Sequence, residues 1–394
     1  MASLIALTRV PEILLDILSY LSNNDVVSLQ STCKALSPVC HKRLWSVLIF
    51  QLNGDPWYPN HGIDSLKVRY HKLTELLKYR GADTSGFFHT KVIWFGSALF
   101  ESRHFIRAEG LRSLLRDVLN KNKVDLQCAI VSFPSHRFDV NNTPEKFEIL
   151  DDLKRYSRAR PSNQKFEIKV QAETVNSLSK YFCLDLITEF VFRVNYKPYE
   201  TRNYSWTVAF GSVDENVTEF AAVLNMMPNL KTFTWISNKH VGKAPVPSEK
   251  SSEDLQKAFG GLKHLKKMEV DGYIFHPSLF LVPPESVKSL KFCGNIKSSW
   301  WENFASSPLN ITSLTFDALA AHCLSYRDIE ELLEYRVKEV GVRGLKTLWL
   351  SGHLPSGLRA CILEKNPEVI SRKFSGKYAY DIEGERTEFR VYMW

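Results

Sequence analysis

One short pattern recurs six times in the second half of the chain: an apolar residue, two residues of any kind, an apolar residue, any residue, and a last apolar residue. The copies ITEFVF, LKTFTW, LKKMEV, VKSLKF, ITSLTF and LKTLWL begin at residues 187, 230, 265, 287, 311 and 345. Alternation over the last four positions predicts a strand in each copy. Helical periodicity lies between copies, at 217–227, 252–259 and 326–340. One strand and one helix cannot bury their own apolar face, so stacked units must share a core.

This rhythm resembles the leucine-rich repeat. The asparagine or cysteine that follows each strand in that family is irregular here, where only Cys293 and Asn238 come near the position. The resemblance implies an α/β fold, an irregular leucine-rich-repeat-like solenoid, with earlier strands at 91–95, 126–133 and 166–170. A plain α/β domain of non-repeating strand–helix units stays open as the alternative. No GH or WD dipeptide recurs, which argues against a propeller.

Side chains alternate along a strand, so the third, fifth and seventh positions of each copy should line the exposed, concave face of such a solenoid. Small polar residues dominate these positions, and Trp349 is the one large aromatic. Lysine occupies the second position in four copies, which predicts a column of lysines at the start of the strands. The column suits an acidic or phosphorylated partner, or it only solubilises an edge, and the C-terminal tail is an alternative cover for Trp349. The candidate substrate-binding residues are Lys291, Trp349, Lys231, Lys266, Lys288 and Lys346.

The N-terminal segment predicts three short amphipathic helices. The first carries an apolar stripe from Val10 to Leu21, with Pro11 in its first turn. Asp25 is the expected N-cap of the second helix, and Ser37-Pro38 opens the third, whose apolar face should run to Leu48. About forty residues bury little surface alone. We therefore expect part of this apolar surface to be covered by the rest of the chain or by a second protein.

These residues resemble an F-box. The resemblance rests on Val10-Pro11, Glu12-Ile13-Leu14, the run from Ile17 to Leu21, Cys33-Lys34 and Leu44-Trp45, and it covers about residues 7–48. Valine stands for the leucine usual before the proline, the residue usual between proline and glutamate is missing, and Leu36 stands where many members have tryptophan. A divergent F-box joined to loose repeats is similar to fungal members of the family.

The resemblance implies the function of a substrate-recognition subunit. F-box helices dock on the Skp adaptor of a cullin–RING ubiquitin ligase, and the remaining chain recruits a protein substrate. The implied adaptor contacts are Val10, Pro11, Ile13, Leu14, Ile17, Leu18, Leu21, Val26, Leu29, Cys33, Leu44 and Trp45. A non-degradative scaffold built from the same parts is the alternative.

The remaining segments complete an expected organisation of F-box (1–50), linker with a helix (51–88), repeat region (89–366) and C-terminal cap or tail (367–394). In the linker, Leu66, Tyr70, Leu73, Leu76 and Leu77 share a helical face. Residues 242–254 are rich in Pro, Ser, Lys and Glu and predict a mobile loop. The tail alternates about Glu383-Gly384 and predicts a hairpin.

Composition restricts the possible functions. The net charge is +8. The 51 Lys and Arg residues are scattered along the chain, without a block of five or six basic residues, so nucleic acid is a poorly supported partner. No stretch approaches 18 apolar residues, and residues 1–22 do not read as a secretory signal. Seven cysteines without a CxxC pair predict reduced thiols and a cytoplasmic or nuclear location. We find no G-x-S-x-G, Walker loop, H-E-x-x-H or Rossmann glycine pattern, and we expect no enzyme activity and no cofactor.

Overall fold

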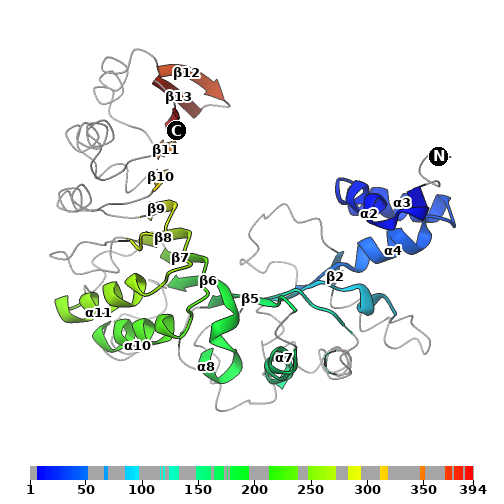
Figure 1. The fold of residues 1–394 in the computed structure, drawn as a ribbon, viewed down its shortest axis with the longest axis horizontal. Coiled ribbons are helices and arrows are strands. Elements are labelled where there is room, and N and C mark those ends of the chain that lie inside the picture. Colours follow the sequence, from blue (N-terminus) through cyan, green and yellow to red (C-terminus); the bar gives the residue numbers. More distant parts are fainter. Residues whose placement is uncertain are drawn as a thin grey trace, which may run out of the picture. The chain divides into compact units, whose positions relative to one another are not determined.

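The structure is a computed structural model of residues 1–394 (Figure 1). The chain divides into two compact units, Met1–Ile187 and Thr188–Trp394. The boundary falls inside the segment expected to be one repeat region. The residues that the structure describes are 7–51, 66–69, 85–96, 116, 119, 124–132, 148–160, 164–172, 175, 178–194, 213–237, 247–271, 283–293, 311–317, 347–350, 369–374, 377–384 and 387–393.

The first unit opens with a 3-10 turn and three α-helices. Their bounds are η1 Leu7–Arg9, α2 Pro11–Ser19, α3 Asn23–Thr32 and α4 Ser37–Trp45. Pro11 and Pro38 occupy first-turn positions, where a missing N–H costs nothing. The expected N-cap Asp25 is wrong. Ser22 caps α3, since its Oγ accepts a hydrogen bond from the backbone N–H of Asp25 at 3.2 Å.

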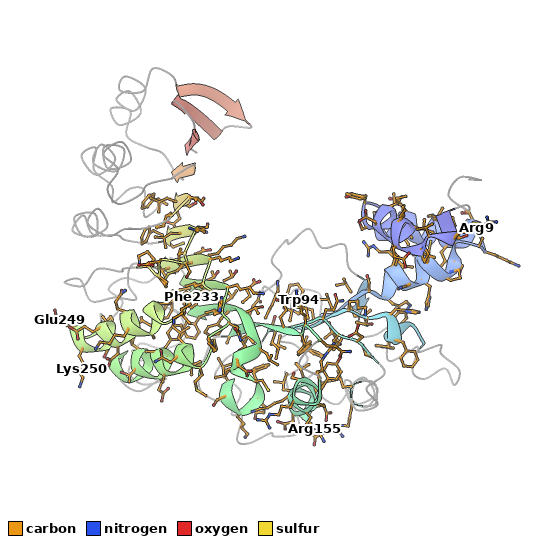
Figure 2. All side chains as sticks on the ribbon, viewed as in Figure 1. Arg9, Trp94, Arg155, Phe233, Glu249 and Lys250 are labelled. Atoms are coloured by element: carbon orange, nitrogen blue, oxygen red, sulfur yellow. The ribbon has the colours of Figure 1, made fainter. Side chains whose placement is uncertain are left out.

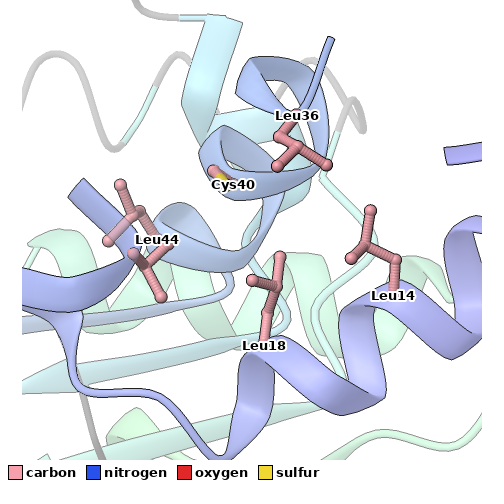
Figure 3. Close-up of a cluster of buried hydrophobic side chains, with 6 residues drawn as sticks. Leu14, Leu18, Leu36, Cys40 and Leu44 are labelled. Carbon is pink, nitrogen blue, oxygen red and sulfur yellow. The ribbon is translucent and has the colours of Figure 1, made fainter. Parts of the chain in front are cut away.

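The three helices enclose a small core of their own. Leu18 of α2, Val26 of α3 and Cys40 of α4 are fully buried there. Figure 3 shows Leu14 and Leu18 of α2 directed at the side chains of α4. The complete buried cluster is Leu14, Leu18, Val26, Leu36, Cys40 and Leu44.

A parallel sheet follows directly after α4. Its strands are β1 Val47–Gln51, β2 Leu66–Arg69, β3 Val92–Phe95, β4 Cys128–Ser132 and β5 Glu167–Ala172, in the order β2-β1-β3-β4-β5. The three strands predicted from the sequence between residues 91 and 170 are therefore confirmed. The third helix was predicted too long, because Val47 and Leu48 begin β1 instead of ending the helix.

The linker prediction is wrong where the structure describes it. Leu66, assigned to a helical face, begins β2, which pairs in parallel with β1 through Leu48↔Leu66. The other four residues of that expected face lie outside the described part of the chain.

The other described elements of the first unit are η2 Ser85–His89, α7 Glu148–Ala159, α8 Leu178–Tyr181 and η5 Leu184–Leu186. Helix α7 packs through buried residues such as Leu150 and Leu153. Tyr156 fixes it to the segment before β4, because its hydroxyl donates to the carbonyl of Val124 at 2.7 Å and accepts from the N–H of Leu126 at 2.9 Å. These bonds satisfy the polar atom of a buried side chain.

In the second unit all six copies of the recurring pattern form strands. They are β6 Ile187–Val194, β7 Thr232–Ser237, β8 Lys267–Asp271, β9 Ser289–Cys293, β10 Ser313–Phe316 and β11 Thr347–Leu350. Each pairs in parallel with the next, and equivalent positions are opposite one another: Phe190↔Phe233, Phe233↔Met268 and Met268↔Leu290. The copies therefore stack in a single register.

Burial alternates along β9 and β10 as the pattern predicts. In β9, Leu290 and Phe292 are buried while Ser289, Lys291 and Cys293 are half-buried. The first, fourth and sixth pattern positions form the core side, where Phe292 stacks on Phe316 with ring centroids 5.5 Å apart. The other face carries the polar positions.

Two described helices flank this sheet, α10 Val213–Asn225 and α11 Glu249–Gly260, and they lie side by side (Figure 1). They supply Phe220 and Phe259, whose rings lie 5.8 and 5.1 Å from the ring of Phe233, the β7 residue labelled in Figure 2. The loop predicted at 242–254 is wrong from Glu249 onward. Ser248 caps α11 by accepting from the N–H of Ser251 at 3.2 Å. The helix expected at 326–340 lies outside the described residues.

The chain ends in strands β12 Val369–Phe374, β13 Lys377–Gly384 and β14 Thr387–Met393. Strands β13 and β14 form the predicted antiparallel hairpin, closing at Gly384↔Thr387. Strand β14 also pairs in parallel with β11. The tail thus extends the sheet beyond the last copy of the pattern.

Candidate functional site

Helix α2 has two apolar stripes. Leu14 and Leu18, four residues apart, are fully buried against α3 and α4, and Leu21 packs beside them. The second stripe contains Ile13 and Ile17, which are four residues apart and so share one helix face, together with the N-cap residue Val10 and the C-cap residue Tyr20, each three residues further on. Val10, Ile13, Ile17 and Tyr20 are 41%, 51%, 38% and 84% exposed. The small core is therefore complete while an apolar face remains in water.

Helix α3 also exposes an apolar side chain, that of Val27, which is 47% exposed. Scattered single apolar residues are ordinary on protein surfaces, whereas a row of four along one short helix and its two cap residues indicates an interaction surface. Tyr20 and Val27 were missed at the sequence level. The three-residue step from Ile17 was enough to find Tyr20, but no comparable spacing singles out Val27.

The structure sorts the twelve expected adaptor contacts into three groups. Exposed are Val10, Pro11, Ile13 and Ile17. Buried within the three-helix core are Leu14, Leu18, Val26 and Leu44. Partly buried and packed on that core are Leu21, Leu29, Cys33 and Trp45. Side chains of the second group hold the helices together, and those of the first group remain available for contact with another molecule.

A compact joint connects α4 to the sheet of the first unit. Trp45 packs on Phe87 of η2 with ring centroids 5.0 Å apart, and the hydroxyl of Thr90 donates to the carbonyl of Trp45 at 3.1 Å. The N–H groups of Lys91 and Val92 both donate to the carbonyl of Ser46, at 2.9 and 3.1 Å. Ser46 is the one residue between α4 and β1. Its carbonyl thereby fixes the end of α4 to the start of β3.

Two histidines belong to the same joint. His41 of α4 lies 6.1 Å from His89 of η2 between ring centroids, in an edge-to-face arrangement. Burial lowers the pKa of His89, and the nearby positive charges of His41, Lys42 and Lys91 lower it further. Protonation of His89 therefore opposes this packing.

A polar cluster lies on the exposed face of the second unit's sheet. Lys291 Nζ donates to Glu269 Oε1 at 2.6 Å, and Cys293 Sγ donates to the same oxygen at 3.3 Å. Burial lowers the pKa of Lys291, but the hydrogen bond and charge of Glu269 outweigh it and leave that pKa above its ordinary value. Burial, with the charge of Glu269 second, raises the pKa of Cys293 far above the ordinary range of a thiol. Cys293 is thus a protonated donor rather than a nucleophile.

Lys291 is one of the six expected substrate contacts, and Trp349 is at the equivalent position two strands away. The register runs Lys291↔Thr315 and Thr315↔Trp349, and Trp349 is paired with Tyr392 of β14 on its other side. Trp349 therefore shares the register position of Lys291 and Thr315, on a strand that pairs with β10 on one side and with the tail strand β14 on the other.

The predicted lysine column is present for its three described members. Lys231, Lys266 and Lys288 are exposed, and their backbones are directly bonded: the N–H of Lys266 donates to the carbonyl of Lys231 at 2.8 Å, and the N–H of Lys288 to that of Lys266 at 2.9 Å. Lys346 lies outside the described residues.

The described residues were searched for metal-ion sites and for helices that could span a membrane. They contain no group of three or more His, Cys, Asp or Glu side chains placed to hold a metal ion. Within the same residues, no helix has the length and apolarity that crossing a bilayer requires. Five cysteines in this part of the chain are free: Cys33, Cys40, Cys128, Cys183 and Cys293.

Comparison with known proteins finds a family similarity in the N-terminal subdomain. The F-box-like family model matches residues 11–51, which comprise α2, α3, α4 and β1. This match supports an F-box protein, and F-box domains typically bind the Skp adaptor. Proteins of this class are generally non-catalytic adaptors, so the match also supports an adaptor role in ligases of the Skp–cullin–F-box type.

One solved structure has a more distant likeness to the chain. A crystal structure of a Bacteroides fragilis protein from the Northeast Structural Genomics Consortium is 16% identical, covers 64% of this chain and 67% of its own, and superposes with a TM-score of 0.31. No curated protein matches the chain.

Proposed function

We propose that this chain is the substrate-recognition subunit of a Skp–cullin–F-box ubiquitin ligase. The F-box-like helices bind the Skp adaptor, and the strands that follow recruit a protein substrate for ubiquitylation. The observation that carries the proposal is the exposed stripe Val10, Ile13, Ile17 and Tyr20, on a subdomain whose own core is already closed. An adaptor that receives this stripe would bury apolar surface that the chain leaves in water.

We further propose that the region from residue 89 to 366 is an irregular leucine-rich-repeat-like solenoid and that 367–394 serve as its cap. Six parallel strands in one register, each built from the same pattern, support this, as do helices α10 and α11 between the first three. Stacked repeats require a terminal unit that covers the last apolar face. The pairing of β14 with β11 suits that role.

Adaptor binding is tested by charge placed on the exposed stripe. Ile17→Asp in the full chain should abolish co-purification with the Skp adaptor, because a carboxylate buried at an apolar interface has no partner. Leu14→Asp is unsuitable, since Leu14 is fully buried and its loss of binding would only report unfolding. Undiminished adaptor binding by a folded Ile17→Asp protein would refute the proposal.

The degradative role needs a second measurement. Proteins that co-purify with the chain should lose ubiquitylation and gain half-life when Ile13 and Ile17 are both replaced by alanine. A deletion of the helices is a poorer tool, because β1 lies between β2 and β3 and begins at Val47. Adaptor binding without any change in the half-life of bound proteins would favour the non-degradative scaffold. We place this activity in the cytoplasm or nucleus, which a fluorescent fusion of the full chain can check.

A further inference from the structure

We infer that the lysine column Lys231, Lys266 and Lys288 binds an acidic segment of a partner protein, running across strands β7, β8 and β9. The inference deepens the proposed function, because the segment would belong to the recruited substrate. It rests on the register of the strands and the exposure of the side chains, so it is testable without the adaptor.

The backbone sets the geometry of the column. Backbone hydrogen bonds link five residues in succession: Thr188, Lys231, Lys266, Lys288 and Thr312. At the two ends of this series, the N–H of Lys231 donates to the carbonyl of Thr188 and the N–H of Thr312 donates to the carbonyl of Lys288, both at 2.8 Å. Neighbouring strands lie about 4.8 Å apart. Three lysines therefore start from adjacent points on one line, with a threonine at each end.

The fold does not explain why these positions hold lysine. Their side chains are exposed and contribute nothing to the apolar core, and the bonds that align them are made by backbone atoms that almost any residue supplies. Like charges directly opposite on neighbouring strands are unfavourable. Solubility alone is served equally well by mixed charges. At Lys266 and Lys288 the repeated cation thus stands at a position where it costs stability.

Nearby side chains reinforce the positive charge. Lys263 and Lys267 are exposed on the same turn and strand start as Lys266. Among the described residues, Lys263, Lys266, Lys267 and Lys288 have no ion pair, whereas Lys231 has an interaction of its own. Two acidic residues lie on the neighbouring strands: Glu189 of β6, opposite Thr232, and Glu269 of β8, which is engaged by Lys291 at 2.6 Å. Along the chain, the exposed Glu285 lies three positions before Lys288, and Glu269 lies three positions after Lys266.

Charge complementarity therefore selects an anionic occupant, and the flanking residues favour a protein over a nucleic acid. The residues that follow the column lysines and Thr312 in their strands are Thr232, Lys267, Ser289 and Ser313, none of them aromatic. Sequence-tolerant binding of single-stranded nucleic acid relies on aromatic side chains that stack on bases. An extended chain of carboxylates, or of phosphorylated serines, needs only the cations.

The experiment compares two triple variants of the full chain that change net charge equally. One is Lys231→Gln/Lys266→Gln/Lys288→Gln in the column. The matched control replaces three exposed basic residues elsewhere, Arg158→Gln/Lys165→Gln/Lys250→Gln. The probes are fluorescein-labelled octaglutamate, an octapeptide of alternating phosphoserine and glycine, octaglutamine and a 12-nucleotide single strand, measured by fluorescence anisotropy at 50 and 300 mM NaCl.

We expect the column variant to bind octaglutamate or the phosphopeptide at least fivefold more weakly than the unmodified chain, with less than a twofold effect in the control. The stronger of the two probes identifies carboxylate or phosphate as the preferred anion. The thermal midpoint of the column variant should stay equal or rise, since like charges are removed. Binding should weaken with salt.

Four results would overturn the inference. They are equal weakening in both variants, no binding of either acidic peptide by the unmodified chain, preference for the oligonucleotide with its loss in the column variant, or a fall of the thermal midpoint by more than about 3 °C, which would assign the lysines a structural role. Adaptor binding is measured in parallel on both variants. Its absence from the unmodified chain would count against the proposed ligase function and leave the peptide result unaffected.

Discussion

Removal of the exposed stripe of α2 should separate adaptor binding from folding. Ile13 and Ile17 are 51% and 38% exposed, so together they leave almost one whole isoleucine side chain in water. Complete burial of such a side chain is worth about 1.5–3 kcal/mol. Because alanine retains one methyl group, Ile13→Ala/Ile17→Ala should lose about 1–2 kcal/mol of binding free energy, or about 5- to 30-fold in Kd.

The assay is titration of the purified full chain with the Skp adaptor by calorimetry. The folded state should change little, since alanine is the best helix former and neither side chain belongs to the closed core. Met226→Ala is the matched control, because Met226 is 52% exposed and lies in the other unit. An unchanged adaptor Kd in the double variant, with the helical signal intact, would refute the argument that this stripe is the docking surface.

Three further outcomes follow from the same geometry. Leu18→Ala should destabilise the three helices by about 2–5 kcal/mol because Leu18 is fully buried; hydrogen exchange of peptides from residues 11–45 measures this, and protection equal to that of Ile17→Ala would contradict it. The folded pKa of His89 lies below 6.5, so the unfolded state takes up the proton first and stability falls as pH drops below about 6.5. His89→Gln should flatten that fall in urea titrations at pH 5 and 7, and an identical pH dependence in both proteins would argue against it. Cys293 should resist iodoacetamide at pH 8 until urea is added, as mass spectrometry of its peptide can show, because burial disfavours its thiolate; equal labelling with and without urea would contradict the assignment.

The strands could be predicted from the sequence because their signal is local. In LKTFTW and VKSLKF the alternation itself decides which side chains are buried, and Phe233, Leu290 and Phe292 are buried as that rule requires. The same rule gave the lysine column, since a shared position in each copy becomes a shared line once the strands pair in register. Whether the copies form a closed repeat architecture depends on segments between the strands, where the sequence has no comparable regularity.

The errors occurred where tertiary contacts override a local pattern. Val47 and Leu48 continue the helical periodicity of α4, yet the carbonyl of Ser46 accepts from the backbone N–H groups of Lys91 and Val92 at the start of β3, and the chain enters the sheet there. Residues from Glu249 onward have the composition of a loop, but Leu255 and Phe259 bury a face that makes them helical. The residues that make these contacts are distant in the sequence, so a pattern of a few neighbouring residues does not contain them.

The division of α2 into buried and exposed stripes could not be read from its sequence either. Leu14 and Ile17 are both apolar and both fit the periodicity, so the pattern names them together as adaptor contacts. Only the packing of α4 decides that Leu14 faces Leu36 and Cys40 while Ile17 faces water.

This division of α2 bears on how the adaptor would dock. The three helices do not need a partner to complete their core, so the adaptor would recognise a preformed surface, and binding would pay little for ordering the helices. A stable fold of residues 11–45 before binding is therefore part of the proposed mechanism. If hydrogen exchange found these helices unprotected in the free chain and protected in the complex, the adaptor would instead be completing the fold.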